Sequence, residues 1–344
     1  MITDDTLREG LQTPGISFTF NEKLKIATML HAAGIRRGLV AYPPAHSSEV
    51  EITRKIVEER LFDETYGLGR TVKKDIDLIE STGANISLHL PFHLNGLDEI
   101  VEAVRYASRK GKLVEVAVVD IVQFSENELV KISKKMSDAG ADVIQLPDTR
   151  GFATPRKMKS LISSVIRNLD ARVEVHCHND HGGAVANSVA GAEVGADYVD
   201  TTIYGLGERN GIADTVSTIS LLRDEGFGID VNLKELGKLY EYLLELIFQK
   251  IGPTLFVNNF PVFGKNTTIH TAGTHAAFSS VFKGSNFSVN VYTGRSMIRN
   301  ILDANGIQLE DSKLEKLVNR IKNNAVESGR AVSIKEIVKM SEEV

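Results

Sequence analysis

Residues 113–146 read LVEVAVVDIVQFSENELVKISKKMSDAGADVIQL, and the pattern in this stretch decides the fold assignment. Residues 113–119 form a short, nearly continuous apolar run, which is typical of a strand covered on both faces. Residues 127–139 then repeat apolar side chains at helical spacing, at Leu129, Ile132 and Met136. Gly140 can adopt the left-handed conformation that ends a helix, and a second apolar run follows at 142–146. The stretch therefore predicts a strand, a helix and a second strand.

The same alternation runs through the first 230 residues. Apolar runs that predict strands occur at 2–4, 37–42, 65–69, 85–90, 113–119, 142–146, 172–177 and 197–203. Helical patterns separate them, at 21–33, 48–61, 72–82, 97–110, 127–139, 155–168, 183–194 and 212–225. Eight strand–helix units in about 225 residues are typical of a closed (β/α)8 barrel, the TIM barrel of the α/β class. The alternative is an open doubly wound sheet, but that fold usually carries a glycine-rich phosphate loop after its first strand, and none is present here.

The alternation stops beyond residue 230. Residues 233–251 predict one amphipathic helix, and a stretch rich in Gly, Asn, Thr and Pro follows it. Three further helical patterns occur at 295–305, 311–327 and 333–343. We therefore expect a catalytic TIM barrel over 1–230, a helix and linker region over 231–293, and a small α-helical subdomain over 294–344.

Composition excludes several classes of protein. The chain has 344 residues, a net charge of −5 and 42% hydrophobic residues, which is ordinary globular composition. A pI near 6.0 argues against a nucleic-acid binder, since such proteins carry a clustered basic surface. The single cysteine, Cys177, excludes an internal disulfide and fits a reducing compartment. The sequence has no apolar run that approaches the length of a membrane span, and its acidic N-terminus does not resemble a secretion signal. We expect a cytoplasmic protein with no membrane or nucleic-acid partner.

Unusual polar residues gather where the predicted strands end. In a (β/α)8 barrel the chemistry lies on the loops that follow the carboxyl ends of the strands. The sequence places at these ends Asp4 to Glu9, His89 and His93, Asp120, Thr149, His176 to His181, and Tyr204 to Gly211. We therefore expect these residues to converge at one mouth of the barrel.

The pair His176 and His178 is the strongest single signal. Side chains alternate along a strand, so both imidazoles would face the barrel mouth and Cys177 would face away, as a buried inert thiol rather than a nucleophile. Two neutral imidazoles and a carboxylate form a common three-ligand site for a divalent metal such as Mg, Mn or Zn. The alternative is a pair of structural histidines held by hydrogen bonds.

Three other features stay open on pattern alone. The loop from Gly205 to Gly211 could cradle a phosphate through its backbone N–H groups, or it could be a plain tight turn. Arg8 and Glu9 could form a solvated ion pair, although the end of a first barrel strand favours a functional role. His270 and His275 lie in the polar stretch after the barrel, where pattern alone predicts surface residues.

Several motifs, in order along the chain, resemble the DRE-TIM metallolyase family. They are Asp4-Asp5-Thr6-Leu7-Arg8-Glu9-Gly10, Leu146-Pro147-Asp148-Thr149-Arg150-Gly151, His176-Cys177-His178-Asn179-Asp180, Gly205-Leu206-Gly207-Glu208-Arg209, and the segment from Gly264 to His275. That family includes homocitrate synthase, isopropylmalate synthase, citramalate synthase and 3-hydroxy-3-methylglutaryl-CoA lyase. The resemblance extends over nearly the whole chain. It implies a metal-dependent condensation of an acyl-CoA, most often acetyl-CoA, with a 2-oxo acid.

The resemblance also implies roles for individual residues. Glu9, His176 and His178 would hold the divalent metal, and Arg8 would neutralise the enolate-like oxygen as charge develops. Thr149 would lie near the substrate carboxylate, and the strand-end residues expected to contact substrate with it are His89, His93 and Asp120. The loop Gly207, Glu208 and Arg209 would lie beside the CoA. His275 would enter the partner subunit's site as an acid/base, which implies a homodimer.

Two positions depart from the family pattern. Leu39 occupies the place of a glutamate in the second strand, and Val119 replaces the glutamate of a Glu-Asp pair in the fifth. Losing two acids beside a metal makes the local potential more positive, so we hypothesise an unusual, more anionic acceptor such as a phosphonate 2-oxo acid. The run from Gly207 to Ile212 resembles homocitrate synthases more than isopropylmalate synthases. A carbon–carbon lyase and a non-catalytic paralogue remain as alternatives.

Overall fold

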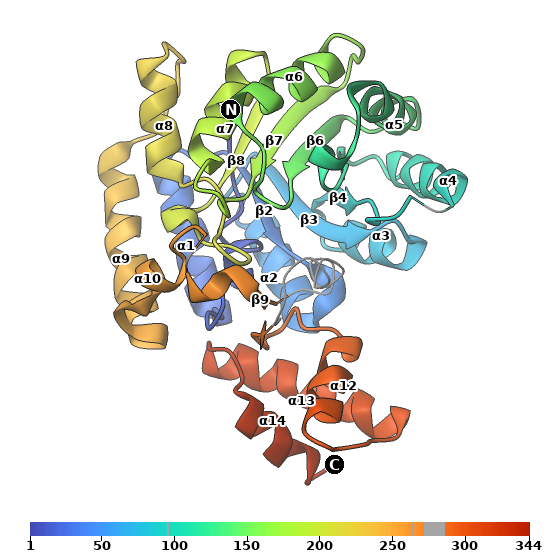
Figure 1. Cartoon of the computed structure of the whole chain (residues 1–344), viewed down its shortest axis with the longest axis vertical. Helices are drawn as coiled ribbons and strands as arrows, with labels where there is room; N and C mark the ends of the chain where they lie inside the picture. The colour runs from blue at the N-terminus through green and yellow to red at the C-terminus, as the bar shows by residue number, and fades with distance from the viewer. Residues whose placement is uncertain (95, 263, 272–285) are drawn as a thin grey trace.

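The computed structural model describes residues 1–94, 96–262, 264–271 and 286–344, and the N-terminal part of the chain forms a closed barrel of parallel strands (Figure 1). The strands are paired in sequence order, and β8 closes the barrel against β1. Their bounds are β1 Ile2–Asp4, β2 Arg37–Ala41, β3 Glu64–Arg70, β4 Asn85–His89, β5 Val114–Ala117, β6 Val143–Asp148, β7 Arg172–Cys177 and β8 Tyr198–Thr201. This confirms the predicted (β/α)8 barrel and excludes the open sheet.

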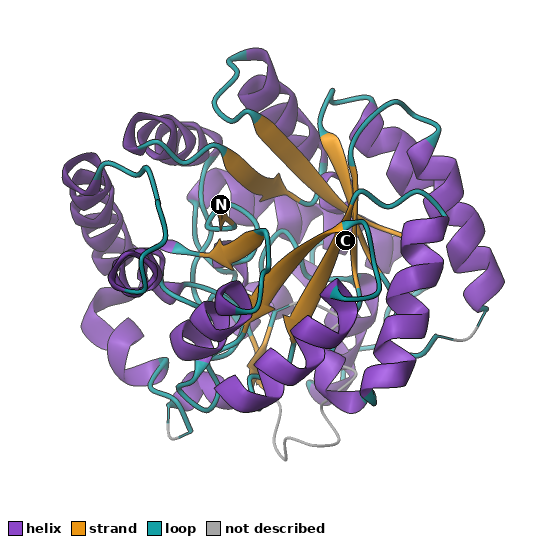
Figure 2. Ribbon diagram, turned by 90° about the horizontal axis from the view of Figure 1, so that it is seen from above, coloured by secondary structure: helices purple, strands orange, loops and turns teal. Residues whose placement is uncertain are grey.

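A helix follows each strand and covers the outside of the barrel, as the view from above shows (Figure 2). The bounds of these helices are α1 Phe20–Ala33, α2 Ser47–Glu58, α3 Lys73–Glu80, α4 Leu97–Ser108, α5 Glu126–Asp138, α6 Pro155–Ile166, α7 Ala184–Glu193 and α8 Thr215–Asp224. Local sequence explains where they begin and end. Ser125 and Glu128 form a capping box that begins α5, and Gly34 adopts φ +92° to end α1.

The amino-terminal end of the barrel interior is closed by a buried ion network. Arg37 lies on the inner face of β2, where Glu115 and Glu174 accept hydrogen bonds from its guanidinium. The rings of Tyr66 and Tyr198 lie 4.1 and 4.2 Å from the guanidinium carbon, so the cation is enclosed by aromatic faces as well as by carboxylates. Because this end is filled, the interior is left to open only at the carboxyl ends of the strands.

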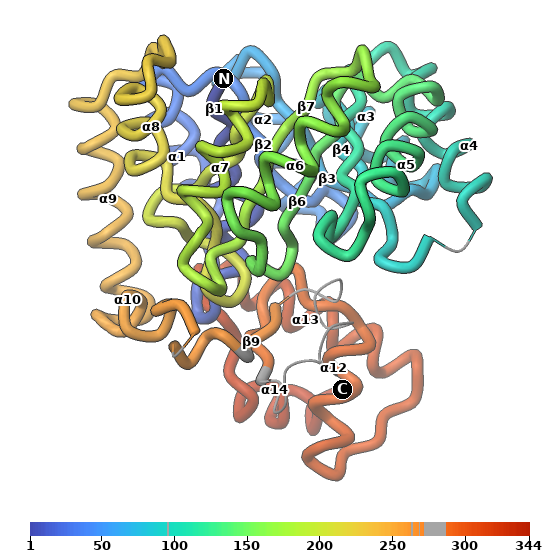
Figure 3. Tube along the Cα trace, turned by 45° about the horizontal axis from the view of Figure 1, so that its top comes forward, coloured from blue at the N-terminus to red at the C-terminus, as the bar shows by residue number. Residues whose placement is uncertain are grey.

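The rest of the chain contributes to two hydrophobic cores. Helix α9, Leu233–Ile251, packs against α1 and belongs to the core of the barrel. A second core joins the C-terminal helices α12 Arg295–Ala304, α13 Asp311–Ser328 and α14 Ile334–Ser341. The connection between them holds α10 Leu255–Asn258 and the short strands β9 Ile269–His270 and β10 Asn286–Phe287. The C-terminal helices lie at one end of the barrel (Figure 3), where Ile16 bridges to Arg330, beside the loops that leave the carboxyl ends of the strands.

Within the described residues, no helix combines the length and the apolar character that crossing a membrane requires.

Candidate active site

The turn after β1 brings Arg8 and Glu9 into the barrel mouth. Asp4 accepts hydrogen bonds from the backbone N–H of Thr6 at 3.0 Å and from its hydroxyl at 2.9 Å, which turns the chain inward after the strand. Arg8 and Glu9 are both buried, and Arg8 Nη1 donates to Glu9 Oε2 at 2.6 Å. Arg8 also pairs with the carboxylate of Asp5. The pair is therefore a buried part of the site rather than a solvated ion pair.

Strand register accounts for the convergence of the inner side chains. In the parallel pair β6 and β7, Gln145 lies opposite Glu174 and Pro147 lies opposite His176. Because side chains alternate along a strand, His178 shares the inner face with His176, as the sequence predicts. Cys177 faces the opposite way, toward Ser188 on α7, and burial raises the pKa of its thiol. This confirms the expectation that Cys177 is buried.

The two histidines face each other. His176 Nε2 lies 3.3 Å from His178 Nε2, and His176 Nδ1 lies 2.7 Å from Asp200 Oδ2 on the neighbouring strand β8. Burial lowers the pKa of His176 to about 4 despite the nearby Glu9 carboxylate. His176 is therefore neutral at physiological pH, which is the form that binds a metal ion.

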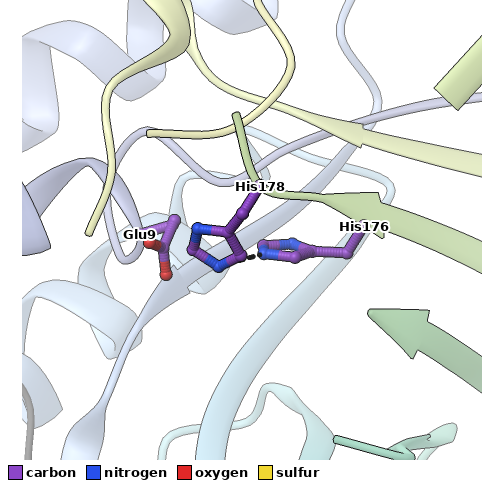
Figure 4. A group of neighbouring side chains, drawn as sticks. All are labelled: Glu9, His176 and His178. Carbon is purple, nitrogen blue, oxygen red and sulfur yellow. Dashed lines mark hydrogen bonds between the residues drawn. The ribbon is translucent and has the colours of Figure 1, made fainter. Parts of the chain in front are cut away.

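Glu9, His176 and His178 form a candidate three-ligand centre (Figure 4). All three are buried, and one ligand atom from each lies within 4.8 Å of the others. Asp5, His176 and Asp200 are also this close, but Asp5 is paired with Arg8, and Asp200 lies against the other ring nitrogen of His176. The first group fits a divalent ion better, because its two Nε2 atoms converge with a carboxylate and Nδ1 of His176 is oriented by Asp200. Neutral imidazole and carboxylate donors suit Mg, Mn or Zn.

A small pocket opens beside this centre. Its lining consists of Arg8, Glu9, His89, Val119, Gln145, Pro147, Thr149, His176 and His178. Two nitrogen atoms, His89 Nε2 and Arg8 Nε, are buried and have no hydrogen-bond partner among the described residues. Burial, together with the nearby cation of Arg8, keeps the pKa of His89 well below its ordinary value, so the ring is neutral. Buried polar atoms without partners are the feature expected where a polar ligand binds.

The remaining residues expected to bind substrate lie at different depths. Thr149 lines the pocket, and its hydroxyl oxygen accepts a hydrogen bond from the backbone N–H of Asp120 at 2.8 Å. The carboxylate of Asp120 is paired with Arg150 at 3.0 Å and is not part of the pocket lining. His93 is exposed and also does not line the pocket.

The two positions that depart from the family pattern also differ in place. Val119 lines the pocket and is buried there. Leu39 packs with Tyr66 and Leu68 and is absent from the pocket lining. Of the two substitutions, only the one at Val119 therefore changes the surface that a bound ligand would contact.

The loop after β8 holds the carboxylate of Glu9 in position. The backbone N–H of Glu208 donates to Glu9 Oε1 at 2.8 Å, and Gln12 Nε2 donates to Glu208 Oε2 at 3.1 Å. A side chain at Gly207 would place its Cβ 2.9 Å from Glu9 Oε1, so this close approach requires glycine. Glu208 and Arg209 are buried, and their side chains point into the protein. The loop therefore fixes a candidate metal ligand.

The linker contains two histidines, His270 and His275. His270 is fully buried, with Nδ1 3.5 Å from Glu208 Oε1, so the expectation of a surface residue is wrong for it. The backbone N–H of Thr271 donates to the same carboxylate oxygen at 2.8 Å, which joins the linker to the loop behind Glu9. His275 lies outside the described residues.

Sequence reasoning missed three residues of the site. Asp200 orients His176, Gln145 lines the pocket, and Asp180 pairs with Arg209 at 2.8 Å. Asp200 and Gln145 are polar residues inside short apolar strands, and this is a signal that could have marked both of them. Asp180 belongs to a quoted motif, but its partner lies 29 residues away in the sequence.

A buried Glu-His-His cluster at the carboxyl mouth of a (β/α)8 barrel, beside a buried arginine, is consistent with the divalent-metal site of a TIM-barrel enzyme. Comparison with known proteins identifies the family of this chain. Residues 1–243 match the model of the HMGL-like family, and the chain belongs to that family.

Among its relatives, 2-isopropylmalate synthase of Sulfolobus acidocaldarius is 34% identical over 357 residues, covering 96% of this chain and 92% of that protein. Homocitrate synthase of Methanocaldococcus jannaschii is 36% identical over 293 residues, covering 80% of this chain and 70% of that protein. Among solved structures, the HMG-CoA lyase of Brucella melitensis has a TM-score of 0.61 at 18% identity, covering 71% of this chain and 97% of that one. The chain is thus an enzyme of the 2-isopropylmalate and homocitrate synthase family, and the solved lyase shares its fold.

Proposed function

We propose that the enzyme condenses acetyl-CoA, or a similar acyl-CoA, with a 2-oxo acid, and that water then hydrolyses the thioester, giving a 2-hydroxy-2-carboxymethyl acid and free CoA. The observation that carries this proposal is the pocket in which Glu9, His176 and His178 adjoin Arg8. The relatives named 2-isopropylmalate synthase and homocitrate synthase support it, because both products are tertiary alcohols of this type.

Glu9, His176 and His178 would hold the metal, which as a Lewis acid polarises the carbonyl of a bound 2-oxo acid. Arg8 supplies a fixed positive charge where negative charge develops on oxygen. Its Nη atoms are held by Asp5, Glu9 and Gln12, so the cation is already oriented before substrate arrives. A preorganised cation in a buried site stabilises such charge more than a mobile one would.

The pocket walls bind the acceptor. Thr149 contributes a hydroxyl next to the proposed metal centre, and we assign it to the carboxylate of the 2-oxo acid. His89 contributes a neutral ring with a buried, unpartnered Nε2, which can hydrogen-bond with a polar side chain of the acceptor. Val119 adds an apolar wall, so this side of the pocket carries no acid that would repel a second anionic group.

These features favour an acceptor with an additional anionic group on its side chain. A second carboxylate, as in homocitrate-type chemistry, and a phosphonate both match the neutral His89 and the missing acid at Val119. An acceptor with a purely apolar side chain would leave His89 Nε2 buried without a partner, which is unfavourable.

Two further assignments follow from family resemblance. We assign His275 to acid/base chemistry in the partner subunit's site, and this role requires a homodimer. We also propose that the CoA binds beside the loop at Gly207. Exposed apolar side chains after the barrel support a protein–protein contact there. They lie on α9, α10 and the following loop, and they are Leu244, Phe248, Phe256, Val257, Phe260 and Val262.

An acceptor screen tests the proposal. Metal-loaded protein is incubated with acetyl-CoA and each of pyruvate, 3-methyl-2-oxobutanoate, 2-oxoglutarate and phosphonopyruvate, and released thiol is measured. We expect CoA release with an acceptor that carries a second anionic group, and no release from the control variant His178→Ala. Absence of release with every 2-oxo acid, at full metal occupancy, would contradict condensation. Release of acetyl-CoA from a 3-hydroxyacyl-CoA would indicate a lyase instead, and a metal content near zero would indicate a non-catalytic protein.

A further inference from the structure

Arg209 is a buried cation in an unfavourable backbone conformation. Its φ of +54° lies in the left-handed region, which costs a non-glycine residue free energy, and the residue is 1% exposed. Its Nε and Nη2 donate to the two carboxylate oxygens of Asp180 at 2.8 and 2.9 Å. Nη2 also donates to the backbone carbonyl of Thr149 at 2.6 Å. One guanidinium therefore joins the loops that follow β6, β7 and β8.

Thr149 is held on its other side as well. Its Oγ1 accepts from the backbone N–H of Asp120 at 2.8 Å, and Asp120 itself adopts φ +55° and pairs with Arg150. Since Oγ1 accepts this bond, the hydroxyl hydrogen of Thr149 is left to donate. Among the described residues it has no acceptor, and Thr149 lines the pocket. The two contacts together fix the direction in which this hydroxyl points.

We propose that Arg209 is a positioning residue, which fixes Thr149 so that its hydroxyl meets the carboxylate of the 2-oxo acid. This assignment rests on the proposed function, since it takes the pocket as the acceptor site. It gives Arg209 a role toward the acceptor and not toward the CoA. The buried guanidinium acts through Thr149 and does not itself line the pocket.

The geometry explains why an arginine occupies this position. A planar guanidinium can bind both oxygens of Asp180 and still donate to a third acceptor, whereas an ammonium group is a point charge without this fork. Asp180 lies two residues after His178, so the same fork also restrains the loop that leaves the histidine strand. The ion pair offsets the unfavourable φ of Arg209, and strain maintained in this way is typical of functional sites.

The test uses variants that avoid leaving a buried charge unpaired. Arg209→Met combined with Asp180→Asn removes both charges, and Arg209→Lys retains the positive charge without the fork. The first readout is hydrogen exchange of the Asp120 amide, whose acceptor is Thr149 Oγ1. The second is the pair of KM values, for acetyl-CoA and for the best acceptor of the screen. We expect Asp120 exchange about ten-fold faster or more, and KM for the 2-oxo acid raised about ten-fold with KM for acetyl-CoA unchanged.

Arg223→Met is the matched control. Arg223 also donates to backbone carbonyls, those of Ile229 and Val231, but at the other end of the barrel, so its loss changes stability without changing either readout. A rise in KM for acetyl-CoA alone would overturn the proposal in favour of a direct CoA contact. If the exchange rate of the Asp120 amide is unchanged in both Arg209 variants, the proposal is overturned whatever the two KM values are. Faster exchange in an enzyme that releases no CoA with any acceptor would contradict the condensation and leave the contact between Arg209 and Thr149 established.

Discussion

Asp200 Oδ2 lies 2.7 Å from Nδ1 of His176, and this contact across two neighbouring strands sets the direction of the ring. A metal ion on Nε2 requires the proton on Nδ1, where Asp200 accepts it. The carboxylate therefore fixes the tautomer that exposes Nε2 toward His178 and Glu9. Asp200 would therefore support a metal held by the three proposed ligands without being one of them.

Asp200→Asn is expected to weaken metal binding about 10- to 100-fold, because the ring loses its anionic acceptor and part of its orientation. Competition with a metal indicator measures the affinity directly. Asp197→Asn is the control, since Asp197 lies just before the same strand and its carboxylate accepts from the backbone N–H of Val173 instead. Equal affinities of the Asp200 variant and the unmodified protein would contradict this role.

Val119→Glu is expected to change the choice of acceptor. A carboxylate at this buried position would repel acceptors with a second anionic group, lowering their kcat/KM about ten-fold or more, and would affect apolar acceptors less. Val119→Gln has nearly the same shape without the charge and separates electrostatics from loss of space. The ratio of kcat/KM for 2-oxoglutarate and 3-methyl-2-oxobutanoate measures the effect. If glutamate and glutamine lower this ratio equally, the pocket selects by shape and not by charge.

Asp4 predicts an unusual pH dependence of stability. Burial raises the pKa of Asp4 in the folded protein to about 7, against an ordinary value of 3.8. Between these values the folded state holds a proton that the unfolded state has lost, so stability falls as pH rises through this window. The contribution of Asp4 to the free energy of unfolding is about 4 kcal/mol. It is fully present below about pH 4 and is lost above about pH 7.

The measurement compares unfolding in denaturant between pH 5 and pH 8 for the protein and for Asp4→Asn. We expect the unmodified protein to lose stability relative to this variant as pH rises. Asp303→Asn removes an exposed carboxylate on α12 and should leave the pH dependence as it is. Parallel curves for the protein and the Asp4 variant would show that the carboxyl does not titrate in this range.

Local patterns in the sequence were sufficient to predict the barrel and the inward-facing pair His176 and His178, whereas Glu9 was named as a metal ligand only by the family resemblance. Strand and helix periods depend on neighbours in the chain, and the alternation within β7 directs His176 and His178 to the same face. The turn after β1 sends Glu9 toward them, in agreement with the position of its motif at the end of the first strand.

Contacts between distant residues could not be predicted in the same way. His270 lies in a polar stretch, and only its packing against Glu208 makes it a buried residue. Arg209 looks like a loop residue until the fold brings Asp180 and the carbonyl of Thr149 to it. The burial of Arg37 depends on acids from several other strands, whose inner faces meet only when the barrel closes.

A buried ion pair between two barrel helices, contacted by a linker residue just before the C-terminal helices, gives the last prediction. Lys23 on α1 pairs with Glu49 on α2, and the hydroxyl of Tyr292, just before α12, donates to Glu49 Oε2 at 3.0 Å. All three residues are buried, and burial raises the pKa of the Tyr292 hydroxyl, so it stays protonated and acts as the donor.

Glu49→Gln leaves the ammonium of Lys23 without its counter-charge, and we expect a loss of about 3–5 kcal/mol in the free energy of unfolding. Tyr292→Phe removes only one hydrogen bond and should cost about 1–2 kcal/mol. Glu51→Gln, on the exposed face of the same helix, serves as the control and should change stability by less than about 0.5 kcal/mol. Urea unfolding followed by tyrosine fluorescence and by circular dichroism checks all three values. If Glu49→Gln costs no more than Glu51→Gln, Lys23 must gain another partner or become neutral, and Tyr292 must then be held against the barrel by apolar packing.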